Sequence, residues 1–189
     1  MEAAGWQVAR FVAQRAVVVC GVGNNGGDGL AAARHLHRWG RLAAVCCVDV
    51  ARLRGPAERE LEVLGKLGIE VTADLRLDDA DVVVDAIFGT GLSRAPDGKF
   101  GEWIESINSS GKSIVAVDVP SGLDADTGVA YAPVVRADVT IALGLPKPGL
   151  SRIGGRVLVA DIGIPYEAYA AVGVAVPPDL FAQGDLVAL

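Results

Sequence analysis

The chain has few aromatic residues, few cysteines and fewer basic than acidic residues. Aromatic residues make up 5% of its 189 residues, and 17 lysines and arginines stand against 23 aspartates and glutamates. No basic cluster offsets the net charge of -6, so we expect no nucleic-acid partner, because a polyphosphate strand would be repelled. No apolar run approaches the roughly 20 residues of a membrane-spanning helix. We therefore expect no membrane partner either.

Three cysteines are too few for a closed set of disulfides. Cys46 and Cys47 are adjacent in an expected strand, so they should point to opposite faces of a sheet and cannot share a metal ion. We interpret all three cysteines as small apolar core residues in a reducing compartment. The first ten residues also lack the charged-then-apolar plan of a secretory signal. These features predict a cytoplasmic protein.

Two kinds of segment alternate along the chain. Short β-branched stretches cover residues 16–20, 42–49, 81–88, 113–119, 138–143 and 156–162. Helical patterns cover residues 3–14, 28–39, 56–67 and 100–110. Strands that are apolar on both faces and separated by helices are typical of a parallel sheet covered on each side. The pattern predicts one α/β domain with a mostly parallel sheet, and an irregular stretch at residues 174–189.

Glycine is abundant, with 24 residues, and much of it follows the expected strands. Loops follow four of the strands, at residues 21–29, 89–94, 120–128 and 144–150, and three of these loops are rich in glycine. Function in an open α/β sheet is expected at the carboxyl ends of the strands. The four loops therefore predict a polar ligand that is held by backbone amides at this edge.

The first of these loops allows two interpretations. Gly21, Gly23 and Gly26 match the dinucleotide-binding pattern G-x-G-x-x-G between a strand and a helix. Asp49 ends the second strand, where a ribose-binding acid would lie, so the pattern favours a nicotinamide-dependent oxidoreductase. Asp28 opposes this interpretation, because a carboxylate on the first turn of the helix would repel a pyrophosphate, although it can also simply complement the helix dipole.

Two further acids lie in or at the end of apolar strands, where the burial of a carboxylate needs an explanation. Asp85 lies inside an otherwise apolar strand, and Asp118 ends another. Burying an ionised carboxylate costs several kcal/mol unless a cation or hydrogen-bond donors compensate. Asp85 is therefore either a metal or substrate ligand or an acceptor for amides of the loop at residues 89–94. Asp118 could likewise be a functional acid or the first residue of an Asx turn.

Four ordered blocks of sequence carry a resemblance to a known family. They are GVGNNGGDGLAAARHL, VVVDAIFGTGLSR, VAVDVPSGLDADTG and GLPKPGL. Together they resemble the YjeF N-terminal family, the NAD(P)H-hydrate epimerases, to which the apolipoprotein A-I-binding protein is related. The resemblance covers residues 3–164 and implies a three-layer α/β/α Rossmann-like domain. It also implies that the substrate is hydrated NADH or NADPH (NADHX or NADPHX), epimerised at C6 of the nicotinamide ring, and that a potassium ion is bound.

The resemblance also implies roles for individual residues. Asp118 matches an acid that contacts substrate, and we expect it to be catalytic because epimerisation needs an acid–base group beside the ring. Potassium would be held by Asn25, Asp85 and Ser121, whose oxygen donors suit a hard cation. The implied substrate contacts are Asn24, Asn25, Gly26, Gly27, Asp28, Gly89, Thr90, Gly91, Leu92, Ser93, Arg94, Ala95 and Asp118. We expect the nicotinamide near Asp118 and the phosphates over residues 89–94 and the neighbouring helix N-terminus.

The chain departs from the family at its start, where relatives carry a longer segment before the stretch that matches residues 1–5. We expect residues 1–189 to be a single domain without that segment and without a dehydratase domain, so that any ADP- or ATP-dependent dehydratase would be a separate chain. We also expect a homodimer. Lys147, between two prolines, is either a contact for phosphate or substrate or a solvated loop residue. A nicotinamide-dependent oxidoreductase and a non-catalytic nucleotide-binding or scaffold protein are the alternative functions.

Overall fold

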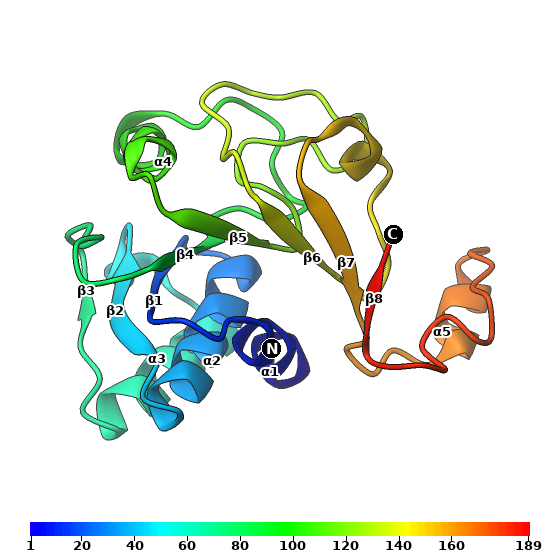
Figure 1. The fold of residues 1–189 in the computed structure, drawn as a ribbon, viewed down its shortest axis with the longest axis horizontal. Coiled ribbons are helices and arrows are strands. Elements are labelled where there is room, and N and C mark those ends of the chain that lie inside the picture. The colour runs from blue at the N-terminus through cyan, green and yellow to red at the C-terminus, as the bar shows by residue number, and fades with distance from the viewer.

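The computed structural model describes residues 1–189 and contains one eight-stranded sheet (Figure 1). The strands are β1 (Ala16–Cys20), β2 (Leu42–Cys47), β3 (Val71–Thr72), β4 (Val82–Ala86), β5 (Ser113–Val117), β6 (Val139–Leu143), β7 (Arg156–Ala160) and β8 (Leu186–Ala188). Their order in the sheet is β3-β2-β1-β4-β5-β6-β7-β8. All neighbours pair in parallel except β7 and β8. The mostly parallel α/β sheet is therefore confirmed.

Helices cover both faces of this sheet (Figure 1). Helices α1 (Glu2–Phe11), α2 (Asn24–Arg38) and α3 (Pro56–Lys66) lie on one face, and α4 (Gly98–Ser109) lies on the other. Helix α5 (Tyr166–Ala171) lies beyond β8, at the end of the molecule opposite β3 (Figure 1). None of the helices combines the length and the apolar character that crossing a membrane requires.

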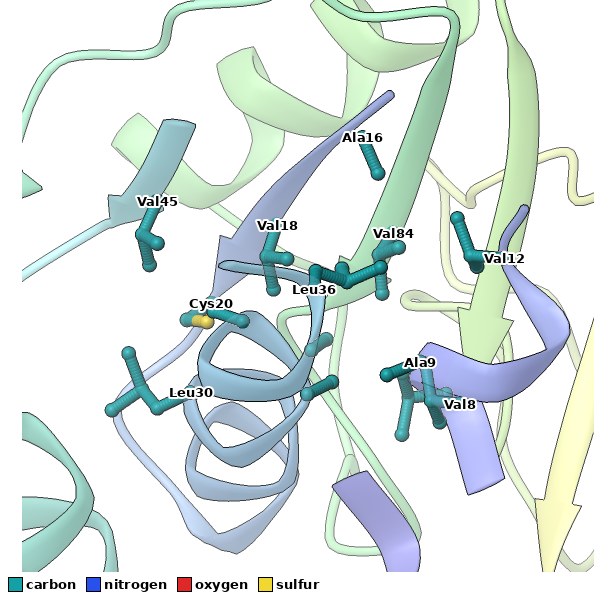
Figure 2. Packing of buried hydrophobic residues seen from close by; sticks show 14 of the residues in the cluster. Val8, Ala9, Val12, Ala16, Val18, Cys20, Leu30, Leu36, Val45 and Val84 are labelled. Carbon is teal, nitrogen blue, oxygen red and sulfur yellow. The ribbon is translucent and has the colours of Figure 1, made fainter. Parts of the chain in front are cut away.

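The two faces of the sheet bury the two largest apolar clusters, of 22 and 12 residues. Val18 and Cys20 of β1 pack with Leu30 and Leu36 of α2 (Figure 2). The intervening β1 residues belong to the cluster that includes Ile104 of α4. This division follows from the strand geometry, since successive side chains point to opposite faces. Each face of the sheet therefore needs its own helical layer.

The adjacent cysteines follow the same rule. Cys46 belongs to the cluster under α4, whereas Cys47 belongs to the cluster under α1, α2 and α3. All three cysteines are free and buried. The predicted role of small apolar core residues is thus confirmed.

Helix α2 begins at Asn24 rather than at residue 28, so the predicted boundary is wrong. Asn and Gly are poor helix formers, which is why the pattern indicated a loop over these residues. Packing requires the glycines: a Cβ at Gly26 would lie 2.1 Å from the Gly21 carbonyl oxygen, and one at Gly29 would lie 2.6 Å from the Ala86 Cβ. Tertiary packing therefore overrides local preference, and Asp28 lies in the second helical turn.

The C-terminal stretch is also more regular than the sequence indicated. Residues 186–188 form β8, which pairs antiparallel with β7 through Leu158, Val159 and Ala160. The side chain of Gln7 on α1 donates a hydrogen bond to the Asp161 carbonyl oxygen at 2.7 Å. The end of β7 is therefore attached to the body of the domain through α1.

Candidate functional site

A cleft of about 440 Å³ lies beyond the carboxyl ends of β1 and β4. The chain order of the strands reverses there, since β1 pairs with β2 on one side and with β4 on the other. Such a switch point is the usual ligand site of an open α/β sheet. The lining residues are Val22, Gly23, Asn24, Asn25, Asp28, Ile87, Phe88, Gly89, Thr90, Gly91, Leu92 and Asp118. Two of the four predicted loops, at residues 21–29 and 89–94, thus meet Asp118 at one edge of the sheet.

Most of the predicted substrate contacts lie on this lining, but two groups do not. Gly26 and Gly27 are buried within α2, and residues 93–95 are exposed beyond the end of the lining segment. Ile87 and Phe88 line the cleft although the motifs did not indicate them. They precede the second glycine loop directly, which is the one signal that could have identified them. The binding roles of all these residues stay predictions.

Asp85 of β4 is fully buried and accepts three hydrogen bonds. The Ser121 backbone N–H donates to Oδ2 at 2.9 Å, the Ser121 hydroxyl donates to Oδ1 at 2.7 Å, and the Ile87 N–H donates to Oδ1 at 3.2 Å. Burial raises the pKa of Asp85 to about 6, although these donors oppose the rise. The expected acceptor role is thus present, but the donors are Ser121 and Ile87 rather than amides of residues 89–94.

The peptide groups of Phe88 connect this network to α2. The Phe88 N–H donates to the Ser121 hydroxyl oxygen at 2.8 Å, and the Asn25 side-chain amide donates to the Phe88 carbonyl oxygen at 2.9 Å. Asn25, Asp85 and Ser121, the three predicted potassium ligands, are therefore joined through one residue. Their elements are far apart in sequence, and only the parallel sheet brings them together.

Asn25 Oδ1 is buried and has no hydrogen-bond partner. A buried polar oxygen without a partner is costly, so its environment fits an additional cation or donor. No group of three or more His, Cys, Asp or Glu side chains is placed to bind a metal ion. A cation here would depend on amide, hydroxyl and carbonyl oxygens and one carboxylate. This set of oxygen donors fits a hard cation, the class to which potassium belongs.

Asp118 has the only positive φ among the non-glycine residues, at 69°. Its backbone N–H donates to the Ile141 carbonyl oxygen at 2.8 Å, and its Oδ1 accepts from the Leu143 N–H at 3.2 Å. The Lys147 ammonium forms an ion pair with the same Oδ1. Asp118 is therefore not the start of an Asx turn, because its carboxylate is bound by the last residue of β6 and by a lysine beyond it, not by the residues that follow Asp118. Its carboxylate is attached to the loop at residues 144–150, the fourth predicted loop.

Asp28 is a second carboxylate on the lining of the cleft. Burial raises its pKa to about 6, and the nearby Asp118 contributes to the rise. Asp49 does not line this cleft and instead precedes the short helical turn Val50–Arg52. The cleft therefore lacks the ribose-binding acid that the oxidoreductase interpretation requires.

The glycines of the first loop have different physical roles. A Cβ at Gly21 would lie 2.0 Å from the Ile87 carbonyl oxygen, so this glycine permits the close approach of β1 and β4. A Cβ at Gly23 would meet nothing within 4 Å, and this residue faces the cleft. Gly23 thus leaves room for a ligand at the N-terminus of α2, whereas Gly21 and Gly26 are required by packing.

Comparison with known proteins gives consistent matches. The family described as "YjeF-related protein N-terminus" matches residues 1–149. The bifunctional NAD(P)H-hydrate repair enzyme Nnr of Hyperthermus butylicus is 43% identical over 191 residues, which cover 92% of this chain and 36% of that protein. The NAD(P)H-hydrate epimerase of Levilactobacillus brevis is 42% identical over 161 residues, which cover 82% of this chain and 75% of that protein. The chain thus spans about a third of the length of the bifunctional relative.

A solved structure shares the fold. The crystal structure of a yeast protein superposes with a TM-score of 0.83 at 26% sequence identity, covering 100% of this chain and 88% of the yeast chain. The agreement over the whole chain supports the arrangement of the sheet and its helices.

Proposed function

Because this chain belongs to the family of YjeF-related N-terminal domains, we propose that it interconverts the R and S epimers of hydrated NADH and NADPH at C6 of the nicotinamide ring. Relatives that are named NAD(P)H-hydrate epimerase and match over about four fifths of this chain support the proposal. The structural observation that carries it is the cleft at the switch point. One wall of this cleft presents the Asp118 carboxylate, and the others present backbone of the two glycine loops.

The chemistry requires a proton donor and acceptor beside the ring. Epimerisation at C6 removes the hydroxyl group through an iminium-like species and returns water to either face of the ring. In its protonated form a carboxyl group can donate a proton to the departing hydroxyl, and the resulting carboxylate, the form that pairs with Lys147 here, can accept a proton from the returning water. We assign this role to Asp118, which lines the cleft and is held at the end of β5.

The same cleft suggests how the substrate would lie. Residues 89–92 and the N-terminus of α2 present backbone N–H groups, and Gly23 leaves space beside them. The free N–H groups and the dipole at a helix N-terminus favour phosphate. We therefore place the phosphates there and the nicotinamide near Asp118. Asp49 has no role in this pose, which distinguishes it from that of a dinucleotide-dependent oxidoreductase.

We also propose that Asn25, Asp85 and Ser121 hold a potassium ion. The buried Asn25 Oδ1, which has no partner, and the buried carboxylate of Asp85 support this assignment. When bound, the ion would supply positive charge that offsets the Asp85 carboxylate. The three side chains would then position the loop after β4 against the start of α2. A cytoplasmic location, a homodimer and a dehydratase that consumes the S epimer belong to the same proposal.

The test uses the mixture of R and S epimers of hydrated NADH together with a dehydratase specific for the S epimer. The parent protein should lead to rapid consumption of both epimers. The Asp118→Asn variant should leave the R epimer, with a loss of roughly 10²–10⁴-fold in the catalysed rate. Asn tolerates a left-handed backbone and can still accept a hydrogen bond from Leu143, so we expect the fold to persist.

The matched control is Asp126→Asn, which removes an exposed carboxylate outside the cleft and should retain the parent rate. Persistence of the R epimer with the parent protein would refute the proposed activity. A near-parent rate with Asp118→Asn would instead refute only the role of Asp118.

A further inference from the structure

Lys147 contacts Asp118 but does not line the cleft. It follows β6 and directly precedes the short helical turn Pro148–Arg152, between two prolines that restrict its backbone. Its ammonium pairs with Asp118 Oδ1 and also donates to the Leu143 carbonyl oxygen at 2.9 Å. The two side chains are only 18% and 13% exposed. Lys147 is therefore not a solvated loop lysine.

The hydrogen bonds of the Asp118 carboxylate are all on one oxygen. Oδ1 accepts from the Leu143 N–H and pairs with Lys147, whereas no hydrogen bond is present on Oδ2. A carboxylate is planar, so holding Oδ1 against the end of β6 also determines where Oδ2 points. The left-handed backbone at Asp118, held by its hydrogen bond to Ile141, restricts the side chain further. Oδ2 is thus the oxygen left for a ligand in the cleft.

We propose that Lys147 is a positioning residue for the epimerisation, holding Asp118 Oδ1 so that Oδ2 faces the nicotinamide ring. This inference rests on the proposed function and assigns Lys147 no contact with substrate. Proton transfer depends on a group being within hydrogen-bond reach of the reacting atom. A displacement of about 1 Å in an active site can lower the rate on the order of 10²-fold. Removing the ammonium should therefore lower turnover more than substrate binding.

Steady-state kinetics of the parent and three variants provide the test. Lys147→Met keeps the length of the side chain and removes the charge, so kcat should fall at least about tenfold while KM stays within about threefold. Lys147→Arg retains a cation that can pair with Oδ1 and should recover most of kcat. The matched control is Lys112→Met. Lys112 also donates to backbone carbonyls, but it directly precedes β5, at the amino ends of the strands and away from the cleft. This control should retain the parent kinetics.

A crystal structure of Lys147→Met provides a readout that does not depend on activity. The Asp118 carboxylate should turn away from the end of β6 or adopt two conformers. Unchanged kcat in Lys147→Met, or an Asp118 carboxylate in the parent orientation, would overturn the inference. Equal losses of kcat in the Met and Arg variants, accompanied by a lower melting temperature, would also overturn it and indicate a structural role. If the parent protein shows no epimerisation, the proposed function fails first, and this inference fails with it.

Discussion

Asp28 should make the protein less stable as the pH rises. Its side chain lines the cleft and is 15% exposed. Burial raises its pKa from 3.8 to about 6, and the nearby Asp118 contributes to the rise. The amino group of Met1, 3.7 Å away, acts in the opposite direction. In the unfolded chain the carboxyl group returns to water and regains its ordinary pKa.

The stability changes with pH because the folded and the unfolded chain bind the Asp28 proton with different affinity. The folded chain binds this proton more tightly than the unfolded chain does, so protonation of Asp28 favours folding. The stabilisation is fully present below about pH 4 and is lost as the pH rises through about 6. A shift of about two units corresponds to at most about 3 kcal/mol. The Asp28→Asn variant cannot titrate, so its stability relative to the parent should rise by up to this amount between about pH 4 and pH 7.

Urea denaturation followed by far-UV circular dichroism, at several pH values in potassium-free buffer, measures this difference. Asp85, whose pKa is also raised to about 6, affects both proteins alike and cancels in the comparison. The control is Asp126→Asn, an exposed position, for which the difference from the parent should not change with pH. A constant difference between Asp28→Asn and the parent over the whole range would refute the argument from burial.

Two further predictions concern the first glycine loop and the cation. Gly26→Ala should lower the free energy of unfolding by about 1–3 kcal/mol or more, because the added Cβ would lie 2.1 Å from the Gly21 carbonyl oxygen. Gly23→Ala should cost less, at most about 1 kcal/mol for the poorer N-cap residue, since nothing lies within 4 Å of the added Cβ. Equal losses of the two variants in thermal denaturation would contradict this contrast. Replacing sodium by potassium should raise the melting temperature of the parent but not of Asp85→Ala; an equal rise in both would argue against the proposed ligand set.

The sequence by itself determined the layers of this protein. The β-branched stretches and the helical patterns between them predicted six strands of a mostly parallel sheet and the four larger helices. This prediction succeeds because hydrophobic periodicity is local and reflects how many faces of an element are buried. The glycine loops also predicted which edge of the sheet carries the cleft, since all parallel strands end at the same edge.

The tertiary structure alone decided how the polar atoms are paired. Helix α2 begins at Asn24 because close packing against β1 and β4 requires glycines that local propensity assigns to a loop. Asp118 is held by Leu143 and Lys147, and Asp85 is held by Ser121, through contacts between strands and loops that are far apart in sequence. A single sequence records which residues follow each strand. It does not record which atoms of neighbouring loops come within hydrogen-bond distance, because that depends on the register and packing of the whole sheet.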